Sequence, residues 1–125
     1  MSHFTDIKTQ IRDKDVLAAA CLELGLAVLE NSEARGYIKN KTRGDLVICL
    51  KGPYDIAANR QADGTYTLRT DWWDGHVAKE VGENYGRLIK HYCVQTTMRE
   101  ARNRGHMVRC IHKTNGDIAV QITGV

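Results

Sequence analysis

The sequence predicts an α+β fold in which two amphipathic helices pack on one face of a mostly antiparallel sheet. Two turn signals predict hairpins, because Asp63-Gly64 and Asn115-Gly116 readily adopt the positive φ angles of tight turns. Apolar residues at helical spacing in residues 13–24 and 79–104 predict the two helices. Hairpins join neighbouring strands antiparallel, so we expect most of the sheet to be antiparallel.

The length and composition predict one domain, residues 1–125. The chain has 125 residues, of which 42% are hydrophobic and 26% charged, so it can hold a core without a disulfide or a metal ion. The mild net charge of +3 excludes a histone-like protein. No apolar run approaches the ~20 residues of a membrane helix, and the first residues lack the pattern of a signal peptide, so we expect a cytoplasmic protein.

The first part of the chain is expected to form strands around one helix. Asp13 predicts the N-cap of this helix, and Gly25 predicts its end. A polar turn is expected between two short strands at 26–30 and 36–39, and the apolar run 46–50 predicts a central strand. The expected strands cover residues 3–11, 26–30, 36–39, 46–50, 55–60 and 66–72.

A long helix is expected over residues 79–104, followed by a hairpin of residues 107–112 and 118–123. Gly82 and Gly86 weaken the first turns of this helix, and Gly105 predicts its end. Its buried stripe is expected to contain Tyr85, Leu88, Ile89 and Tyr92. With both helices on one face, the other face of the sheet must be exposed to water or buried by a partner, so a homodimer is a reasonable expectation.

Four stretches carry a resemblance to a known family. They are residues 1–9 (MSHFTDIKT), 54–56 (YDI), 92–101 (YCVQTTMREA) and 115–118 (NGDI). In this order along almost the whole chain, they resemble the family named for hypothetical chloroplast open reading frame thirty-five, whose bacterial members are catalogued as a domain of unknown function. The resemblance implies no catalytic residues, and it implies an AAA+ ATPase as a candidate protein partner. The stretch Trp72-Trp73-Asp74 departs from the pattern of the family.

The cysteines give no sign of a metal site or a cofactor. Cys21, Cys49, Cys93 and Cys110 are far apart, and each has apolar neighbours. A zinc site would show a closely spaced pair of ligands, so we expect reduced thiols that act as small apolar residues. We therefore expect no metal ion and no cofactor.

Residues 85–113 form a basic segment, with seven basic residues and Glu100 as the one acid. The basic residues are Arg87, Lys90, Arg99, Arg102, Arg104, Arg109 and Lys113. Arg87, His91, Met98 and Arg102 fall at helical spacing on the side away from Tyr85 and Leu88. Such a face can bind phosphates, but a solvated helix face has the same composition. None of the recognised nucleic-acid motifs is present.

The stretch 71–76 (DWWDGH) is the most unusual part of the sequence. Side chains alternate along a strand, so Trp72 and Trp73 cannot both enter one core, and one of them is expected to be exposed. An exposed tryptophan beside Asp74 and His76 suits a ligand or a protein contact. The alternative is that the strand ends here and both rings pack under the following helix.

The sequence therefore predicts a small accessory or binding protein, without an enzymatic role, that contacts a protein partner or an anionic ligand. The first alternative is a nucleic-acid or nucleotide binder that uses the basic segment. The second is a small enzyme, which would require Asp71, Asp74, His76 and Tyr54 to meet in one pocket. The candidate binding residues are Trp72, Trp73, Asp74, His76, Arg87, His91, Arg99, Arg102 and Arg104.

Overall fold

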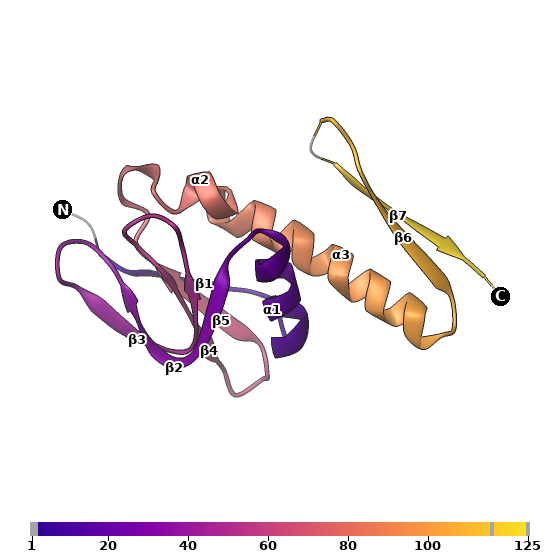
Figure 1. The fold of residues 1–125 in the computed structure, drawn as a ribbon. Coiled ribbons are helices and arrows are strands. Elements are labelled where there is room, and N and C mark those ends of the chain that lie inside the picture. The colour runs from indigo at the N-terminus through magenta and orange to yellow at the C-terminus, as the bar shows by residue number, and fades with distance from the viewer. Residues whose placement is uncertain (1–2, 116, 125) are drawn as a thin grey trace.

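The protein was analysed as a computed structural model that describes residues 3–115 and 117–124. The described chain has an α+β fold, as predicted, with its two longer helices on one face of an antiparallel sheet (Figure 1). The strands of this sheet lie in the order β1-β5-β4-β3-β2, and every neighbouring pair is antiparallel. A separate two-stranded sheet, β6-β7, follows the last helix.

The elements follow one another from the N-terminus as strand, helix, four strands, three short helical turns, a long helix and a hairpin. The strands are β1 (Thr5–Lys8), β2 (Ala27–Arg35), β3 (Lys41–Cys49), β4 (Ile56–Arg60), β5 (Tyr66–Thr70), β6 (Met107–His112) and β7 (Ile118–Thr123). The helical elements are α1 (Lys14–Glu23), η1 (Trp73–Gly75), α2 (Ala78–Val81), η2 (Glu83–Tyr85) and α3 (Gly86–Asn103). None of the described helices is long and apolar enough to cross a membrane.

Helix α1 begins and ends where the sequence predicts. The Asp13 carboxylate accepts hydrogen bonds from the backbone N–H groups of Asp15 and Val16, at 2.9 and 3.1 Å. These bonds satisfy two of the amides that a helix N-terminus leaves free. Gly25 has a φ of +75° just after the helix, a conformation that glycine adopts at little cost.

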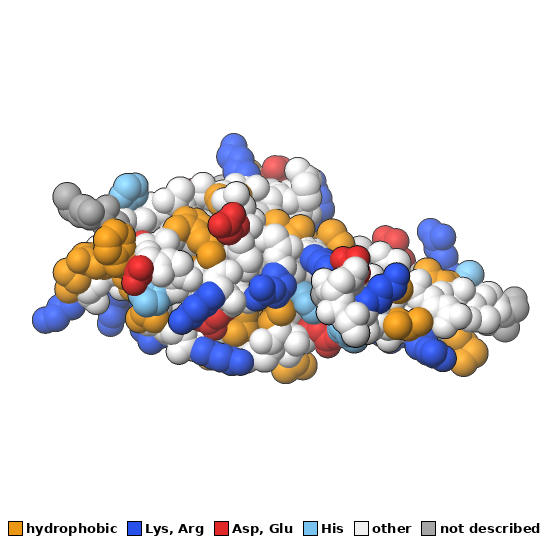
Figure 2. Space-filling view, turned by 90° about the horizontal axis from the view of Figure 1, so that it is seen from above, with side chains coloured by type: hydrophobic (Ala, Val, Ile, Leu, Met, Phe, Trp, Pro, Cys, Tyr) orange, Lys and Arg blue, Asp and Glu red, His pale blue; other side chains and the backbone are white. Residues whose placement is uncertain are grey.

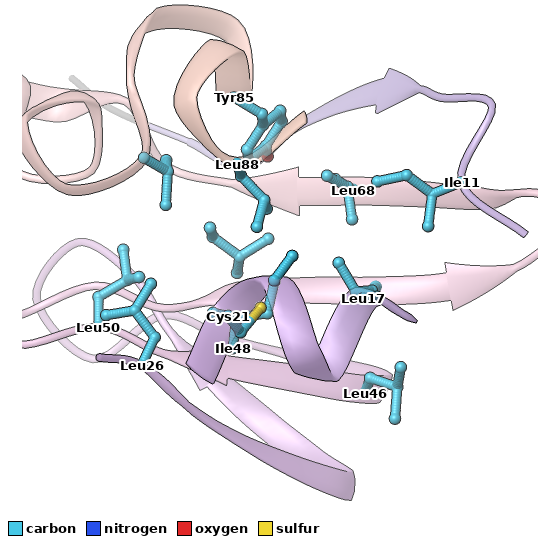
Figure 3. Close-up of a cluster of buried hydrophobic side chains, with 14 of the residues drawn as sticks. Ile11, Leu17, Cys21, Leu26, Leu46, Ile48, Leu50, Leu68, Tyr85 and Leu88 are labelled. Carbon is cyan, nitrogen blue, oxygen red and sulfur yellow. The ribbon is translucent and has the colours of Figure 1, made fainter. Parts of the chain in front are cut away.

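The main core lies between the sheet and the helices. Leu17 and Cys21 of α1 meet Ile48 and Leu68 of the sheet and Leu88 of α3, and all five are fully buried (Figure 3). Burial of a leucine or isoleucine side chain contributes about 1.5–3 kcal/mol, so this face supplies most of the apolar stabilisation of the fold.

The opposite face of the sheet is largely exposed, in line with one alternative of the sequence prediction, since the side chains of Asp6 and Arg69 on this face are 47% and 41% exposed. Ala34, Val47 and Ala57 form a second, smaller buried cluster there. The sheet curls around this cluster, because the end of β2 meets the residue before β4 although β3 lies between them. Asp55 donates its backbone N–H to the carbonyl of Arg35 at 2.9 Å.

The strand predicted at 26–30 forms the first part of β2, but the prediction of a separate strand at 36–39 was wrong. Strand β2 runs through the expected polar turn, because it pairs with β3 on both sides of Asn31. The expected second strand is instead the β2–β3 turn, closed by a 2.8 Å hydrogen bond from Gly36 N–H to the carbonyl of Asn40. The Phe4 ring lies so close to Gly36 that a Cβ at this position would overlap it.

The prediction of one helix over residues 79–104 was also wrong in its first part. Gly82 has φ +83° and ψ +163°, which ends α2, and Asn84 and Tyr85 also have positive φ values. The chain therefore turns before α3 begins, and this turn places the Tyr85 ring in the core. Gly105 has a φ of +80° and ends α3 as predicted.

The predicted final hairpin is present, but it stands apart from the main sheet. Strands β6 and β7 are paired from Met107↔Thr123 to His112↔Ile118, and both contact α3 (Figure 1). The predicted turn at Asn115-Gly116 lies partly outside the described residues. The Lys113 N–H donates to the carbonyl of Asp117 at 2.8 Å and closes the hairpin.

Candidate functional site

Aromatic side chains gather where the β2–β3 turn meets the loop after β5. The rings of Tyr37 and Trp73 form an edge-to-face pair with their centroids 5.8 Å apart. The rings of Tyr54 and His76 form a second such pair at 5.3 Å. Figure 2 shows hydrophobic, acidic and histidine side chains close together at this end of the molecule. We call Tyr37, Ile38 and Trp73 the aromatic surface.

The two adjacent tryptophans have different environments, and one is exposed as expected, although β5 ends at Thr70 and strand alternation is therefore not the cause. The Trp72 ring is half-buried and packs on the ring of Tyr85, with centroids 4.8 Å apart. Trp73 is 46% exposed, and Ile38, next to its contact residue Tyr37, is 79% exposed. The alternative, in which both tryptophan rings pack under the following helix, is wrong.

Two carboxylates lie around these rings. Asp71 is 1% exposed, and its Oδ1 accepts a hydrogen bond from the backbone N–H of Trp73 at 2.9 Å. Its Oδ2 is buried and has no hydrogen-bond partner among the described residues. Asp74 has a φ of +56°, and its exposed carboxylate lies 3.8 Å from Nε2 of His76. The loop is thus held by Asp71 and presents Asp74 to solvent.

The structure brings the four residues of the enzyme alternative into one region. Tyr54 is 6% exposed, and its ring touches the ring of His76. Burial raises the pKa of the Tyr54 hydroxyl, and the negative charge of Asp71, followed by Tyr37 and Asp74, raises it further. No three His, Cys, Asp or Glu side chains in the described part of the chain form a group that could hold a metal ion.

An ion pair between the half-exposed Arg35 and the buried Asp55 holds the β2–β3 turn in place. The Asp55 carboxylate is 4% exposed and accepts hydrogen bonds from Nε and Nη2 of Arg35, both at 2.8 Å. It also accepts from the backbone N–H groups of Arg35 and Leu50, at 3.0 and 3.2 Å. Because Arg35 precedes the turn that carries Tyr37 and Ile38, this pair fixes that side of the aromatic surface.

Glu80 of α2 anchors the neighbouring β3–β4 loop. Its carboxylate accepts hydrogen bonds from the backbone N–H groups of Lys51 and Gly52, at 2.7 and 3.0 Å. Arg87 in turn donates to the backbone carbonyls of Lys79 and Glu80, at 3.0 and 3.1 Å. Arg87, a candidate binding residue from the sequence, therefore stabilises the α2–α3 junction.

The other basic candidates do not gather into one patch. Arg99 forms an ion pair with Asp13 at 3.4 Å, and Lys90 forms one with Asp117 at 3.4 Å. Arg102 and Arg104 are exposed near the end of α3. Lys and Arg side chains are spread along the face in Figure 2, with acidic side chains between them.

Met98 corrects the predicted basic face of the long helix. It was expected beside Arg87, His91 and Arg102, on the exposed side, but it is only 9% exposed. Met98 and the buried Ala101 lie in the half of α3 that is followed by the β6–β7 hairpin, and they are not part of the main core cluster.

His91 lies at the junction between α1, α3 and β6. Burial lowers the pKa of His91, Glu23 opposes this effect, and His112, Lys90 and Arg87 add to it. His112 Nε2 lies 3.6 Å from a carboxylate oxygen of Glu23 and 3.8 Å from Sγ of Cys110. No local pattern predicts this cluster, because its members come from three separate elements.

The lowered pKa of His91 predicts a stability that depends on pH. Below its ordinary pKa the unfolded chain takes up a proton that folded His91 still lacks, so the free energy of unfolding should fall as the pH drops from about 7 to about 5.5. The His91→Gln variant should lose less stability over this range than the wild type. Urea titrations at several pH values measure this, with the exposed residue His3 as the control in a His3→Gln variant. Equal losses in wild type and His91→Gln would contradict the prediction.

Comparison with known families gives a match over most of the chain. The model of the family described as "Protein of unknown function (DUF1257)" matches residues 20–121. The chain belongs to this family. The matched region begins within α1 and ends within β7, so the aromatic surface lies inside the DUF1257 domain. Searches of the curated proteins and of the solved structures each found no significant match.

Sequence reasoning missed Tyr37 and Ile38, since both were assigned to a strand. Gly36 and Asn40, which flank them, are typical turn residues, and this signal could have placed the two side chains at a turn. The Arg35–Asp55 pair had no local signal, because the two residues are 20 positions apart and meet through the curl of the sheet.

Proposed function

We propose that this protein is a small cytoplasmic binding protein that contacts a partner protein through the aromatic surface. The observation that carries the proposal is the exposure of Trp73 and Ile38, at 46% and 79%, on either side of Tyr37. Tryptophan and tyrosine are enriched among the residues that dominate binding energies, and an exposed apolar group supplies the burial that drives association.

The rigidity of the surface supports the same function. Tyr37 follows Arg35, which the buried Asp55 carboxylate holds with two side-chain hydrogen bonds of 2.8 Å. Trp73 follows Asp71, whose buried carboxylate caps its backbone N–H. A surface that is already ordered loses less conformational entropy when a partner binds.

The first partner to test is an AAA+ ATPase. This choice comes from the resemblance of the chain to the family named for hypothetical chloroplast open reading frame thirty-five, and it is a proposal about the partner alone. The test must also distinguish this partner from a second copy of the chain bound to the same aromatic surface. The oligomeric state is therefore measured in parallel by analytical ultracentrifugation.

The Trp73→Ala variant should bind the AAA+ ATPase partner at least ~10-fold more weakly than the wild type, which corresponds to about 1.4 kcal/mol. Isothermal titration calorimetry measures the two dissociation constants. The control is Leu22→Ala, because Leu22 is a similarly exposed apolar residue, at 76%, on α1. This control should bind within about twofold of the wild type.

Other outcomes would overturn the proposal in defined ways. Loss of binding in an Arg102→Glu, Arg104→Glu double variant, with Trp73→Ala unaffected, would favour the basic segment. Affinity for RNA or DNA that falls steeply with salt would favour the nucleic-acid alternative. The enzyme alternative ranks below the binding function, because the 3.8 Å between His76 Nε2 and Asp74 Oδ2 is longer than a hydrogen bond.

A further inference from the structure

We infer that a groove at the β2–β3 turn binds an acidic segment of the partner protein. In this segment, Asp or Glu carboxylates meet the basic side chains of the groove, and one apolar side chain packs on Ile38. The inference deepens the proposed function and rests on it for the identity of the partner. The groove itself can be tested without that partner, because its affinity for a short acidic peptide can be measured directly.

The groove has a volume of about 470 Å³ and adjoins the aromatic surface, because Ile38 belongs to both. We call it the turn groove. It is lined by the basic residues Arg35, Lys39 and Lys41 and by the apolar residues Ile38 and Pro53, and no described Asp or Glu lines it. Positive charge and apolar surface therefore lie side by side in one concave place.

The described part of the chain does not neutralise the two lysines. Lys39 and Lys41 are exposed, and neither forms an ion pair with another described residue. Lys41 is also the register partner of Arg35 in the β2–β3 pair, so two like charges lie directly opposite each other. Such a pair destabilises an antiparallel ladder, and a bound carboxylate would offset the repulsion.

The Arg35 guanidinium is fixed in place and still has a free nitrogen. Nε and Nη2 donate to the Asp55 carboxylate, and Nη2 also donates to the carbonyls of Leu50 and Gly52, at 3.3 and 2.9 Å. Nη1 makes no hydrogen bond to a residue that the structure describes, and the side chain is 50% exposed. Because the guanidinium is already ordered, it loses little entropy when Nη1 binds a carboxylate.

Ile38 adds an apolar contact to this charge. Its φ is +59°, a value that is rare for a β-branched residue, yet its side chain is 79% exposed. The turn that holds it is closed by a 3.0 Å hydrogen bond from the N–H of Asn40 to the carbonyl of Tyr37. An apolar side chain of the ligand that covers Ile38 removes this surface from water and adds to the binding energy.

The size of the charge favours a peptide over a nucleic acid. Proteins that bind DNA tightly through its backbone make about 6–10 phosphate contacts, whereas three basic side chains line the turn groove. Asp55 already balances the charge of one of them, Arg35. Two lysines beside an apolar patch match a short segment in which acidic residues flank one apolar residue.

The test uses the end-capped peptide GEELEEG and its neutral analogue GQQLQQG. Each is titrated into the ¹⁵N-labelled full chain, and the backbone signals of the β2–β3 turn are followed by NMR. GEELEEG should give a saturable shift with a dissociation constant on the order of 0.1–1 mM. GQQLQQG should bind at least about fivefold more weakly, because it lacks the carboxylates. GEEGEEG should bind at least about threefold more weakly than GEELEEG, because it lacks the apolar contact.

Two double variants separate the turn groove from positive charge in general. Lys39→Gln with Lys41→Gln should weaken GEELEEG about three- to tenfold and leave GQQLQQG unchanged. Both lysines are exposed, so this variant should fold. The control, Arg109→Gln with Lys113→Gln, removes the same charge from exposed positions of the β6–β7 hairpin, at the other end of the molecule (Figure 1). It should bind GEELEEG within about twofold of the wild type.

Three results would overturn the inference. They are equal affinity for GEELEEG and GQQLQQG, a Lys39→Gln, Lys41→Gln variant that binds GEELEEG like the wild type, and a control variant that loses as much affinity. Binding of a phosphoserine peptide or of single-stranded RNA more than about tenfold tighter than GEELEEG would overturn an acidic segment as the ligand. If Trp73→Ala weakens the AAA+ ATPase but the double lysine variant does not, the proposed function stands and only the acidic-segment site fails.

Discussion

Replacement of Asp55 by alanine should lower the free energy of unfolding by about 2–4 kcal/mol. The variant leaves the backbone N–H groups of Arg35 and Leu50 without their acceptor at a site where the carboxylate is 4% exposed, whereas water can reach the half-exposed Arg35 guanidinium. A buried group that loses its partner costs its full desolvation penalty. Urea denaturation followed by circular dichroism measures the loss.

The chain contains a matched control for this prediction. Asp6 and Arg69 form a second two-pronged pair, at 2.7 and 2.8 Å, with side chains that are 47% and 41% exposed. Asp6→Ala should therefore cost no more than about 1 kcal/mol, because water replaces the lost partner. If the two variants lost equal stability, burial of the Asp55 carboxylate would not be the cause of the loss in Asp55→Ala.

The features that could be predicted from the sequence are those that depend on neighbouring residues. The Asp13 cap and the Asp63-Gly64 hairpin both depend on the conformations of a few consecutive residues, and both are confirmed. Gly64 alone has a positive φ in that turn, at +86°, since the glycine supplies the whole requirement. Trp73 is exposed as expected, but the strand alternation from which this was argued does not apply, because β5 ends at Thr70.

The features that the sequence did not predict depend on contacts between distant residues. Asn31 and Ser32 favour a turn locally, but pairing with β3 keeps β2 continuous. Met98 follows the spacing of exposed residues, yet it is buried in the part of α3 that the hairpin follows. Arg99 has the character of a phosphate ligand, but it meets Asp13, which is 86 positions away. In each case a long-range contact overrides the local pattern.

The same reasoning applies to the candidate site. The Trp72–His76 stretch is visible in the sequence, whereas its contact with Tyr37 forms only because the β2–β3 turn lies against the loop after β5. The charge of the basic segment is also visible, but its distribution depends on which acids lie nearby in three dimensions. Local sequence therefore identified Trp73, one of the three residues of the aromatic surface, and the tertiary fold added Tyr37 and Ile38.

Gly82→Ala should lower the free energy of unfolding by about 1–3 kcal/mol, or more if the local clash does not relax. The φ and ψ of Gly82, +83° and +163°, lie in a region that other residues rarely adopt. A Cβ at this position would also lie 2.7 Å from the backbone nitrogen of Arg87. Denaturation in urea measures the change, and the near-ultraviolet circular dichroism of the Trp72–Tyr85 ring pair reports the local effect.

Gly86 is the matched control, and its substitution should have the opposite sign. Gly86 has a helical φ of −55°, and no heavy atom lies within 4 Å of an added Cβ. Gly86→Ala should therefore raise the stability by about 0.4–1 kcal/mol, because alanine lowers the entropy of the unfolded chain. If Gly82→Ala were as stable as the wild type, α2 and α3 would form the continuous helix that the sequence predicts. Tyr85 could then not pack on Trp72, and the loop that presents Trp73 would lose its support.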